Sequence, residues 1–204
     1  MSRSAPTPRP LTQYELEVLE TLPAGRCELV ANEAHFTRVV RDGMGRATVS
    51  LDIMTADFKA MLVPSPRKGG KARSVVELFR SLARKGVEIR ILHAGTPSGP
   101  ALSELKKISV EEGGKLTIRR CPRLHAKAVI IDARAMYLGS ANLTGAGLGA
   151  KGVDKRNFEM GIWTDASLMI EGVMEQFNAL WEGERCRKCK RKDVCPVPLE
   201  EPEL

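Results

Sequence analysis

LHAKAVIIDARAMYLGSAN, from Leu124 to Asn142, is the most informative segment of the chain. It places His125 and Lys127 two residues apart, and it places Ser140 two residues before Asn142. Side chains with this spacing on a β-strand emerge on one face, so we expect each pair to be presented together. Histidine can attack phosphorus, while lysine, serine and asparagine can donate hydrogen bonds to phosphate oxygens. The stretch therefore predicts a site that combines a nucleophile, a positive charge and hydrogen-bond donors.

The full pattern is H-x-K-x4-D-x6-G-S-x-N, which adds Asp132 and Gly139. It resembles the HKD motif of the phospholipase D superfamily. The resemblance implies that one motif histidine forms a covalent phosphohistidine, while a second protonates the leaving group and then activates water. The chain carries the motif once, and one motif makes half an active site in this superfamily. The resemblance therefore implies a homodimer with a composite site, in which His125 of both subunits acts and Lys127 and Asn142 hold the phosphate.

Further site residues are suggested by the same resemblance. The superfamily commonly carries an N-x-E element after the motif, and Asn157–Glu159 (NFE) fits it. Glu159 is the candidate to orient the nitrogen of the catalytic histidine that does not react. Asp132 belongs to the site motif, but it lies five residues beyond Lys127 and so on the opposite strand face. We expect it to have a structural role in ordering the turn at 132–135.

Alternating strand and helix patterns predict an α/β fold. With the resemblance, they predict a phospholipase D-like mixed sheet flanked by helices on both faces, plus a small Cys-rich tail. We expect strands at residues 47–54, 87–92, 115–120, 126–132, 136–140 and 158–164. We expect helices at residues 12–22, 32–42, 74–86, 101–109 and 166–183. Asn32 and Asp165 are the expected N-caps of two of these helices, and Gly86 is an expected helix end. His35 and His93 are expected to be structural or solvated.

We expect the chain to divide into a disordered tail at residues 1–11, a catalytic domain at 12–182 and a basic, Cys-rich tail at 183–204. Its 204 residues are 43% hydrophobic and 28% charged, with a net charge of +7, which favours polyanionic partners. A basic loop at 64–73 and only 4% aromatic residues favour contacts to a phosphate backbone over base stacking. No apolar run suits a membrane span, and the start of the chain is not a secretory signal. We therefore expect a cytoplasmic protein without stable membrane insertion.

The tail contains CRKCKRKDVCP, with Cys186, Cys189 and Cys195 in the spacing C-x2-C-x5-C. Two thiolates in C-x2-C can hold one metal, and the third can reach the same centre. A fourth ligand must then come from elsewhere, and Cys27 and Cys121 are the choices. The spacing resembles the iron–sulfur tail of RecB-type nucleases, which implies a [4Fe–4S] cluster and favours Cys27 as its fourth ligand. Zinc is the alternative metal.

The sequence predicts a metal-independent phosphodiesterase that acts as a nuclease on DNA or RNA. The first alternative is a phospholipid phosphodiesterase, which would need an apolar, membrane-facing rim near the site. The second is a non-catalytic dimer that binds nucleic acid. The sequence leaves open whether the substrate is single- or double-stranded.

Overall fold

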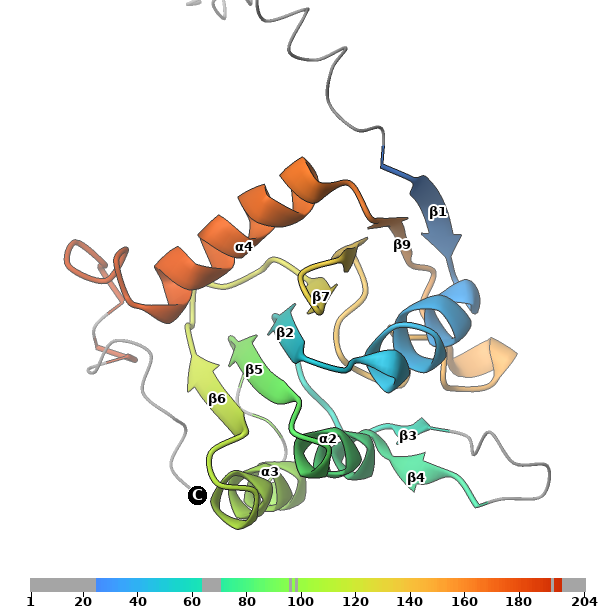
Figure 1. Ribbon diagram of the computed structural model, residues 1–204, viewed down its shortest axis with the longest axis horizontal. Coiled ribbons are helices and arrows are strands. Elements are labelled where there is room, and N and C mark those ends of the chain that lie inside the picture. Colours follow the sequence, from blue (N-terminus) through green and yellow to red (C-terminus); the bar gives the residue numbers. More distant parts are fainter. Residues whose placement is uncertain (1–24, 64–70, 96, 98, 192, 196–204) are drawn as a thin grey trace, which may run out of the picture.

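The computed structural model describes residues 25–63, 71–95, 97, 99–191 and 193–195 (Figure 1). The strands of the main sheet are β1 (Cys27–Ala31), β2 (Ser50–Thr55), β5 (Glu88–His93), β6 (Leu116–Arg120), β7 (Ala128–Ile131), β8 (Ala135–Gly139) and β9 (Met160–Thr164). Within the described residues they form one seven-stranded sheet in the order β1-β9-β8-β7-β2-β5-β6. The strands β2, β5 and β6 run parallel, and the other neighbours are antiparallel. The predicted mixed sheet is confirmed.

Helices cover both faces of this sheet (Figure 1). The helices are α2 (Val75–Arg84), α3 (Gly99–Glu111) and α4 (Ser167–Trp181). Phe79 of α2 and Leu105 of α3 belong to the apolar cluster on one face, which includes Ile53 of β2. Phe177 of α4 belongs to a second cluster, which includes Met54 of the same strand. Because Ile53 and Met54 are consecutive, β2 is buried on both faces, as expected of a central strand in an α/β sandwich.

Helix α2 shows how local sequence sets an element. The Ser74 hydroxyl accepts the N–H of Val76 at 3.2 Å and caps the helix start. Gly86 has a φ of +90°, a conformation that suits glycine and ends the helix as predicted. A two-stranded sheet of β3 (Leu62–Val63) and β4 (Arg73–Ser74) precedes it. Residues 64–70 of the expected basic loop, the expected helix at 12–22 and the tail at 1–11 lie outside the described residues.

The structure corrects several expected element boundaries. The expected helix at 32–42 is a short π-type helix, η1 (Phe36–Arg41), and short 3₁₀ turns lie at η2 (Met44–Arg46) and η3 (Val153–Lys155). Asn32 does not cap η1, because it has a positive φ and its side-chain oxygen accepts the N–H of Glu159 at 3.3 Å. Asp165 does not cap α4, because its carboxylate accepts the N–H of Arg26 at 2.6 Å. The strand β1 was absent from the expected elements.

No helix in the described ranges combines the length and apolar character that crossing a lipid bilayer requires.

Candidate active site

Several neighbouring strands begin or end along one edge of the sheet, which runs across the strands from β2 to β9. Motif residues gather along this edge. The carbonyl of Lys127, just before β7, accepts the N–H of Gly139 at the end of β8 (3.1 Å). Ala128 at the start of β7 pairs with Met54 near the end of β2. Gly139 in turn pairs with Gly161 near the start of β9. Antiparallel pairing therefore brings the two halves of the motif, and the segment after β2, to the same edge.

His125 and Lys127 form the centre of the candidate site. The Lys127 ammonium nitrogen lies 3.2 Å from Nδ1 and 3.3 Å from Nε2 of His125. Lys127 is only 8% exposed, whereas His125 is exposed to solvent. The exposed imidazole is accessible from solvent, and the buried ammonium group beside it places a positive charge at the same point of the surface. The sequence predicts that both residues lie on a strand, and this is wrong, because β7 begins only at Ala128.

The side-chain amide of Asn142 is held by the segment that follows β2. Its oxygen accepts the N–H groups of Ala56 and Asp57, each at 3.1 Å, and the hydroxyl of Thr55 at 3.3 Å. Thr55 is buried, and its oxygen also accepts the N–H of Leu143 at 2.9 Å. These contacts leave the amide nitrogen of Asn142 as the group that can donate to a phosphate. Thr55 was missed from the sequence, although it directly follows the predicted strand at 47–54.

Ser140, Asn157 and Glu159 form a hydrogen-bonded cluster at the same edge. The Ser140 hydroxyl donates to one carboxylate oxygen of Glu159, and the Asn157 amide donates to the other at 3.0 Å. The Ser140 oxygen also accepts the N–H of Met160 at 3.1 Å. Among the described residues, Glu159 makes no hydrogen bond to His125. Within one subunit the carboxylate therefore fixes Ser140, and the predicted contact that would orient His125 is not formed.

Asp132 lies at the far end of β7 and does not reach this site. Its carboxylate accepts the N–H groups of Thr48, Val49 and Ser50 at distances of 2.8–3.1 Å. Burial acts to raise the pKa of Asp132, but these hydrogen bonds and one from the Thr48 hydroxyl outweigh it and lower the pKa. Grouping Asp132 with the catalytic residues is therefore wrong. Its contacts match the structural role that the strand-face argument predicts.

The other two histidines are buried. Nε2 of His35 lies 2.9 Å from the hydroxyl of Tyr137, which also accepts the N–H of Ala141 at 3.2 Å. Burial lowers the pKa of His35 and raises that of Tyr137 to about 12. His93 donates from Nδ1 to the Gly95 carbonyl at 2.8 Å, and burial lowers its pKa to about 4. Burial and these ring contacts match the structural role expected of both histidines, and the Tyr137 contact was missed.

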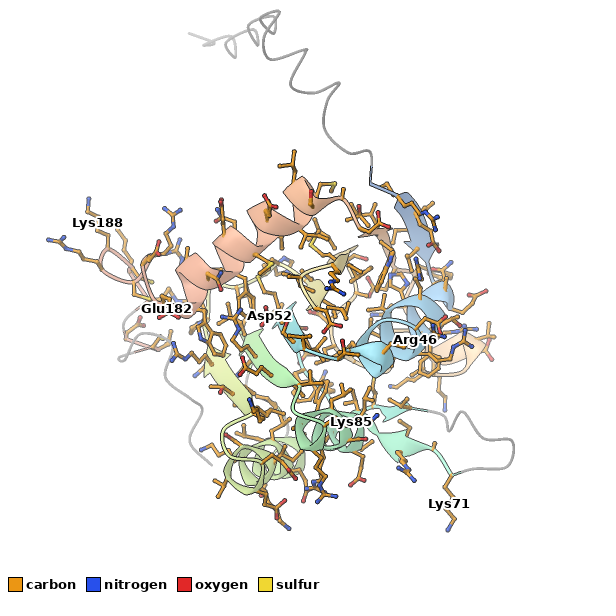
Figure 2. The ribbon with its side chains drawn as sticks, viewed as in Figure 1. Arg46, Asp52, Lys71, Lys85, Glu182 and Lys188 are labelled. Atoms are coloured by element: carbon orange, nitrogen blue, oxygen red, sulfur yellow. The ribbon has the colours of Figure 1, made fainter. Side chains whose placement is uncertain are left out.

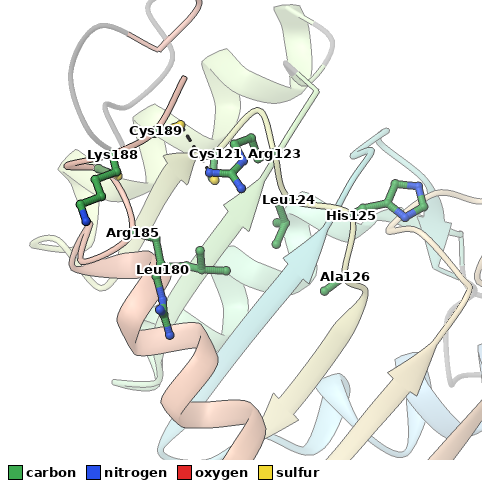
Figure 3. Close-up of a pocket in the computed structure, with 10 residues that line it drawn as sticks. Cys121, Arg123, Leu124, His125, Ala126, Leu180, Arg185, Lys188 and Cys189 are labelled. Carbon is green, nitrogen blue, oxygen red and sulfur yellow. Dashed lines mark hydrogen bonds between the residues drawn. The ribbon is translucent and has the colours of Figure 1, made fainter. Parts of the chain in front are cut away.

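Two pockets reach the site residues. The first, which we call the tail pocket, has a volume of about 450 Å³ (Figure 3). It is lined by Cys121, Arg123, Leu124, His125, Ala126, Leu180, Arg185, Cys186, Lys188 and Cys189. The second has a volume of about 530 Å³ and includes Asn142, Asn157, Lys59 and Lys151 in its lining. Both pockets thus combine a motif residue with lysine or arginine side chains, which suits an anionic substrate.

The structure separates the expected metal ligands. Cys27 begins β1, at one edge of the sheet, whereas Cys121 directly follows β6, at the other. Cys186 and Cys189 line the tail pocket together with Cys121. With neighbouring strands about 4.8 Å apart, six strand spacings put Cys27 on the order of 29 Å away. The choice of Cys27 as the fourth ligand is therefore wrong, and the alternative, Cys121, lies with the tail.

The fold and the motif define a phospholipase D-like domain. The family described as "Cardiolipin synthase, PLD-like domain" matches residues 40–181, which is more than half of the chain, so the chain belongs to this family. This confirms the resemblance to the phospholipase D superfamily. None of the curated proteins matches the chain.

Solved structures share the fold at low sequence identity. NucT from Helicobacter pylori aligns with a TM-score of 0.57 at 15% identity, over 78% of this chain and 97% of NucT. The phospholipase D family member Nuc from Salmonella typhimurium also has a TM-score of 0.57, at 18% identity, over 78% of this chain and 95% of Nuc. TrmBL2, an archaeal chromatin protein, aligns with a TM-score of 0.52 at 17% identity, over 83% of this chain and 57% of TrmBL2.

Proposed function

We propose that this protein is a metal-independent phosphodiesterase that cleaves DNA or RNA through a phosphohistidine intermediate. The observation that carries the proposal is the contact between His125 and Lys127 at the sheet edge, where the Asn142 amide also lies. These side chains supply a nucleophile, a fixed positive charge and a hydrogen-bond donor. They lie in the stretch that resembles the HKD motif, and the family match covers this stretch.

The proposed reaction takes place at a centre shared by two subunits. A ring nitrogen of His125 attacks phosphorus, and the bond from phosphorus to the leaving oxygen breaks. His125 of the partner subunit gives that oxygen a proton. Water then attacks the phosphohistidine, passes a proton to the partner's His125 and releases a phosphate monoester. Lys127 and Asn142 bind the non-bridging oxygens, where negative charge must be neutralised during both steps.

Nucleic acid is the preferred substrate because cations line both pockets near the site. Arg123, Arg185 and Lys188 line the tail pocket, and Lys59 and Lys151 line the second pocket. Cations that lie beyond the scissile phosphate can bind neighbouring phosphates of a polymer. NucT, the phospholipase D family member Nuc and the DNA-binding protein TrmBL2 share the fold. These likenesses support the proposal without specifying the substrate.

A phospholipid phosphodiesterase is the second candidate, because exposed apolar side chains lie next to the site. Phe158 is 97% exposed and Met160 is 66% exposed, and they flank Glu159. Such residues would suit an acyl-chain rim as well as a subunit interface. A dimer that only binds nucleic acid is the third candidate, and turnover separates it from the other two.

The test is cleavage in excess EDTA. We expect the purified full chain to cleave labelled DNA or RNA under these conditions, because His125 and Lys127 replace the functions of a catalytic metal ion. His125→Ala should abolish cleavage while the fold and the dimer persist. Phosphatidylcholine vesicles serve as the lipid substrate in parallel. Strict dependence on added Mg²⁺, or full activity in His125→Ala, would overturn the proposed mechanism.

A further inference from the structure

The carboxy-terminal tail is packed against the β6 edge of the sheet. Arg119 of β6 donates to the carbonyl of Trp181 at 2.7 Å, and its guanidinium lies 4.7 Å from the centre of the Trp181 ring. The thiol of Cys195 lies 4.0 Å from the carbonyl of Arg120. Arg120 is the residue directly before Cys121. The end of α4 and the last tail cysteine therefore both adjoin the segment that contains Cys121.

The tail pocket brings other cysteines to the same place. Cys121, Cys186 and Cys189 all line it, and Figure 3 shows Cys189 beside Arg123 and Cys121. The Arg123 guanidinium lies 3.7 Å from the thiol of Cys189. Four of the five cysteines of the chain thus lie along the β6 edge, and three of them share a pocket.

The backbone between two of these cysteines already forms a tight turn. The N–H of Cys189 donates to the carbonyl of Cys186 at 3.0 Å, and the N–H of Cys186 donates to the carbonyl of Gly183 at 2.9 Å. Gly183 has a φ of +76°, which glycine adopts without strain. A turn that spans C-x2-C is what lets two thiolates bind one metal centre.

We propose that Cys121, Cys186, Cys189 and Cys195 bind one metal centre through four thiolates. Thiolates select zinc or an iron–sulfur cluster, and both accept four cysteine ligands. Among the residues that the structure describes, no three potential ligands are already arranged around a common centre. Binding therefore closes the site by drawing the tail onto the segment after β6, and its free energy contributes to folding. The cation of Arg123 offsets part of the negative charge that four thiolates carry.

This centre lies at one end of the pocket that reaches His125. In Figure 3 the His125 ring lies at the end of the pocket away from the tail, so the centre takes no part in the chemistry. Arg185 and Lys188 flank Cys186 in sequence and line the same pocket. If the proposed nuclease function holds, the centre fixes these two cations along the path to His125. The metal site itself does not depend on that function.

The experiment compares the two alternative ligands. The full chain is purified anaerobically, and its zinc, iron and acid-labile sulfide are measured per chain. The metal-depleted chain is then titrated with Co²⁺, because thiolate-to-cobalt charge-transfer absorption reports sulfur ligation. The variants are Cys121→Ser, Cys189→Ser and, as the matched control, Cys27→Ser.

We expect one centre per chain in the original protein and in Cys27→Ser, and loss of the centre and of the cobalt absorption in Cys121→Ser and Cys189→Ser. Iron with sulfide identifies the cluster, and zinc identifies the single ion. Circular dichroism reports whether each variant folds. If either Cys121→Ser or Cys189→Ser fails to fold, the other variant still tests the proposal. Absence of all metals with no cobalt–thiolate absorption, or loss in Cys27→Ser with retention in Cys121→Ser, would overturn the proposal. Because no substrate is present, this outcome is independent of the EDTA cleavage test.

Discussion

Asn142 presents its amide nitrogen because backbone groups hold its oxygen. The N–H groups of Ala56 and Asp57 can only donate, so the side-chain oxygen must face them and the nitrogen must face away. The motif glycine, Gly139, is likewise required by its surroundings. A Cβ on Gly139 would collide with the Tyr137 hydroxyl and lie 2.6 Å from the Cα of Gly161. Asn142 is therefore fixed by a segment distant in sequence, and Gly139 by a side chain of its own strand and the backbone of the neighbouring strand β9.

Acid should destabilise the protein through His93. Its pKa is about 4 in the folded protein, below the ordinary value of about 6.5, so the unfolded chain binds the proton first as pH falls. The free energy of unfolding should therefore decrease between about pH 6.5 and pH 4, by about 3 kcal/mol in total, and this contribution should be constant above that window. Urea denaturation at stepped pH measures the decrease. His93→Asn keeps a donor for Gly95 and should remove most of it, and an equally steep decrease in that variant would contradict the assignment.

At the scale of elements, a charged pair helps to hold α4 on the sheet. Asp52 of β2 is 4% exposed and lies beneath α4 in Figure 2. Both of its carboxylate oxygens accept hydrogen bonds from Arg90 of β5, at 2.7 and 2.8 Å. The Arg90 guanidinium also donates to Asn178 at 3.1 Å and lies 4.7 Å from the centre of the Phe177 ring. One arginine therefore links two central strands to the helix that covers them.

Asp52→Asn should lower the free energy of unfolding by about 2–4 kcal/mol. It keeps the side-chain volume but leaves the partly buried Arg90 without its counter-charge. Urea denaturation measures the change. Glu28→Gln is the matched control, because it breaks the exposed ion pair with Arg38 (2.9 Å) and should cost less than about 1 kcal/mol. Equal losses in the two variants would show that burial of the Asp52–Arg90 pair is not what makes it stabilising.

In the molecule as a whole, the parallel and antiparallel halves of the sheet bring every motif residue except Asp132 to one edge. Phe158 lies at the same edge, two residues before β9, and its side chain is exposed. Full burial of such a side chain stabilises an interface by roughly 1.5–3 kcal/mol. A second copy of the chain that joined at this edge would bury Phe158 and bring its own His125 toward the first. The composite centre proposed above requires such an arrangement.

Phe158→Asp should therefore convert the dimer into a monomer and abolish phosphodiester cleavage together. Sedimentation velocity measures the assembly, and the EDTA cleavage test measures the activity. Val110→Asp is the control, since Val110 is 84% exposed on α3, and it should change neither property. A Phe158→Asp dimer that still cleaves nucleic acid would contradict the interface. A dimer that loses only lipid cleavage would instead identify Phe158 as part of an acyl-chain rim.

Features that depend on local spacing could be predicted from the sequence. The motif residues from His125 to Asn142 were identified because their order and spacing are visible along one short segment. The helix now seen as α2 was predicted because Ser74, an apolar stripe and Gly86 all lie within it. Strand–helix alternation was enough to predict an α/β fold, and the mixed sheet with helices on both faces came from the resemblance of the motif to the phospholipase D superfamily.

Contacts between segments distant in sequence became visible only in the folded chain. β1 pairs with β9, so Cys27 lies opposite Thr164 at the edge away from the tail, a partnership that no local pattern encodes. The tail instead adjoins Cys121, which reversed the choice of fourth metal ligand. Thr55 and the Asp52–Arg90 pair were missed for the same reason. Strand order and buried polar contacts are set by packing between segments far apart in the chain, whereas periodicity and capping act within a few residues.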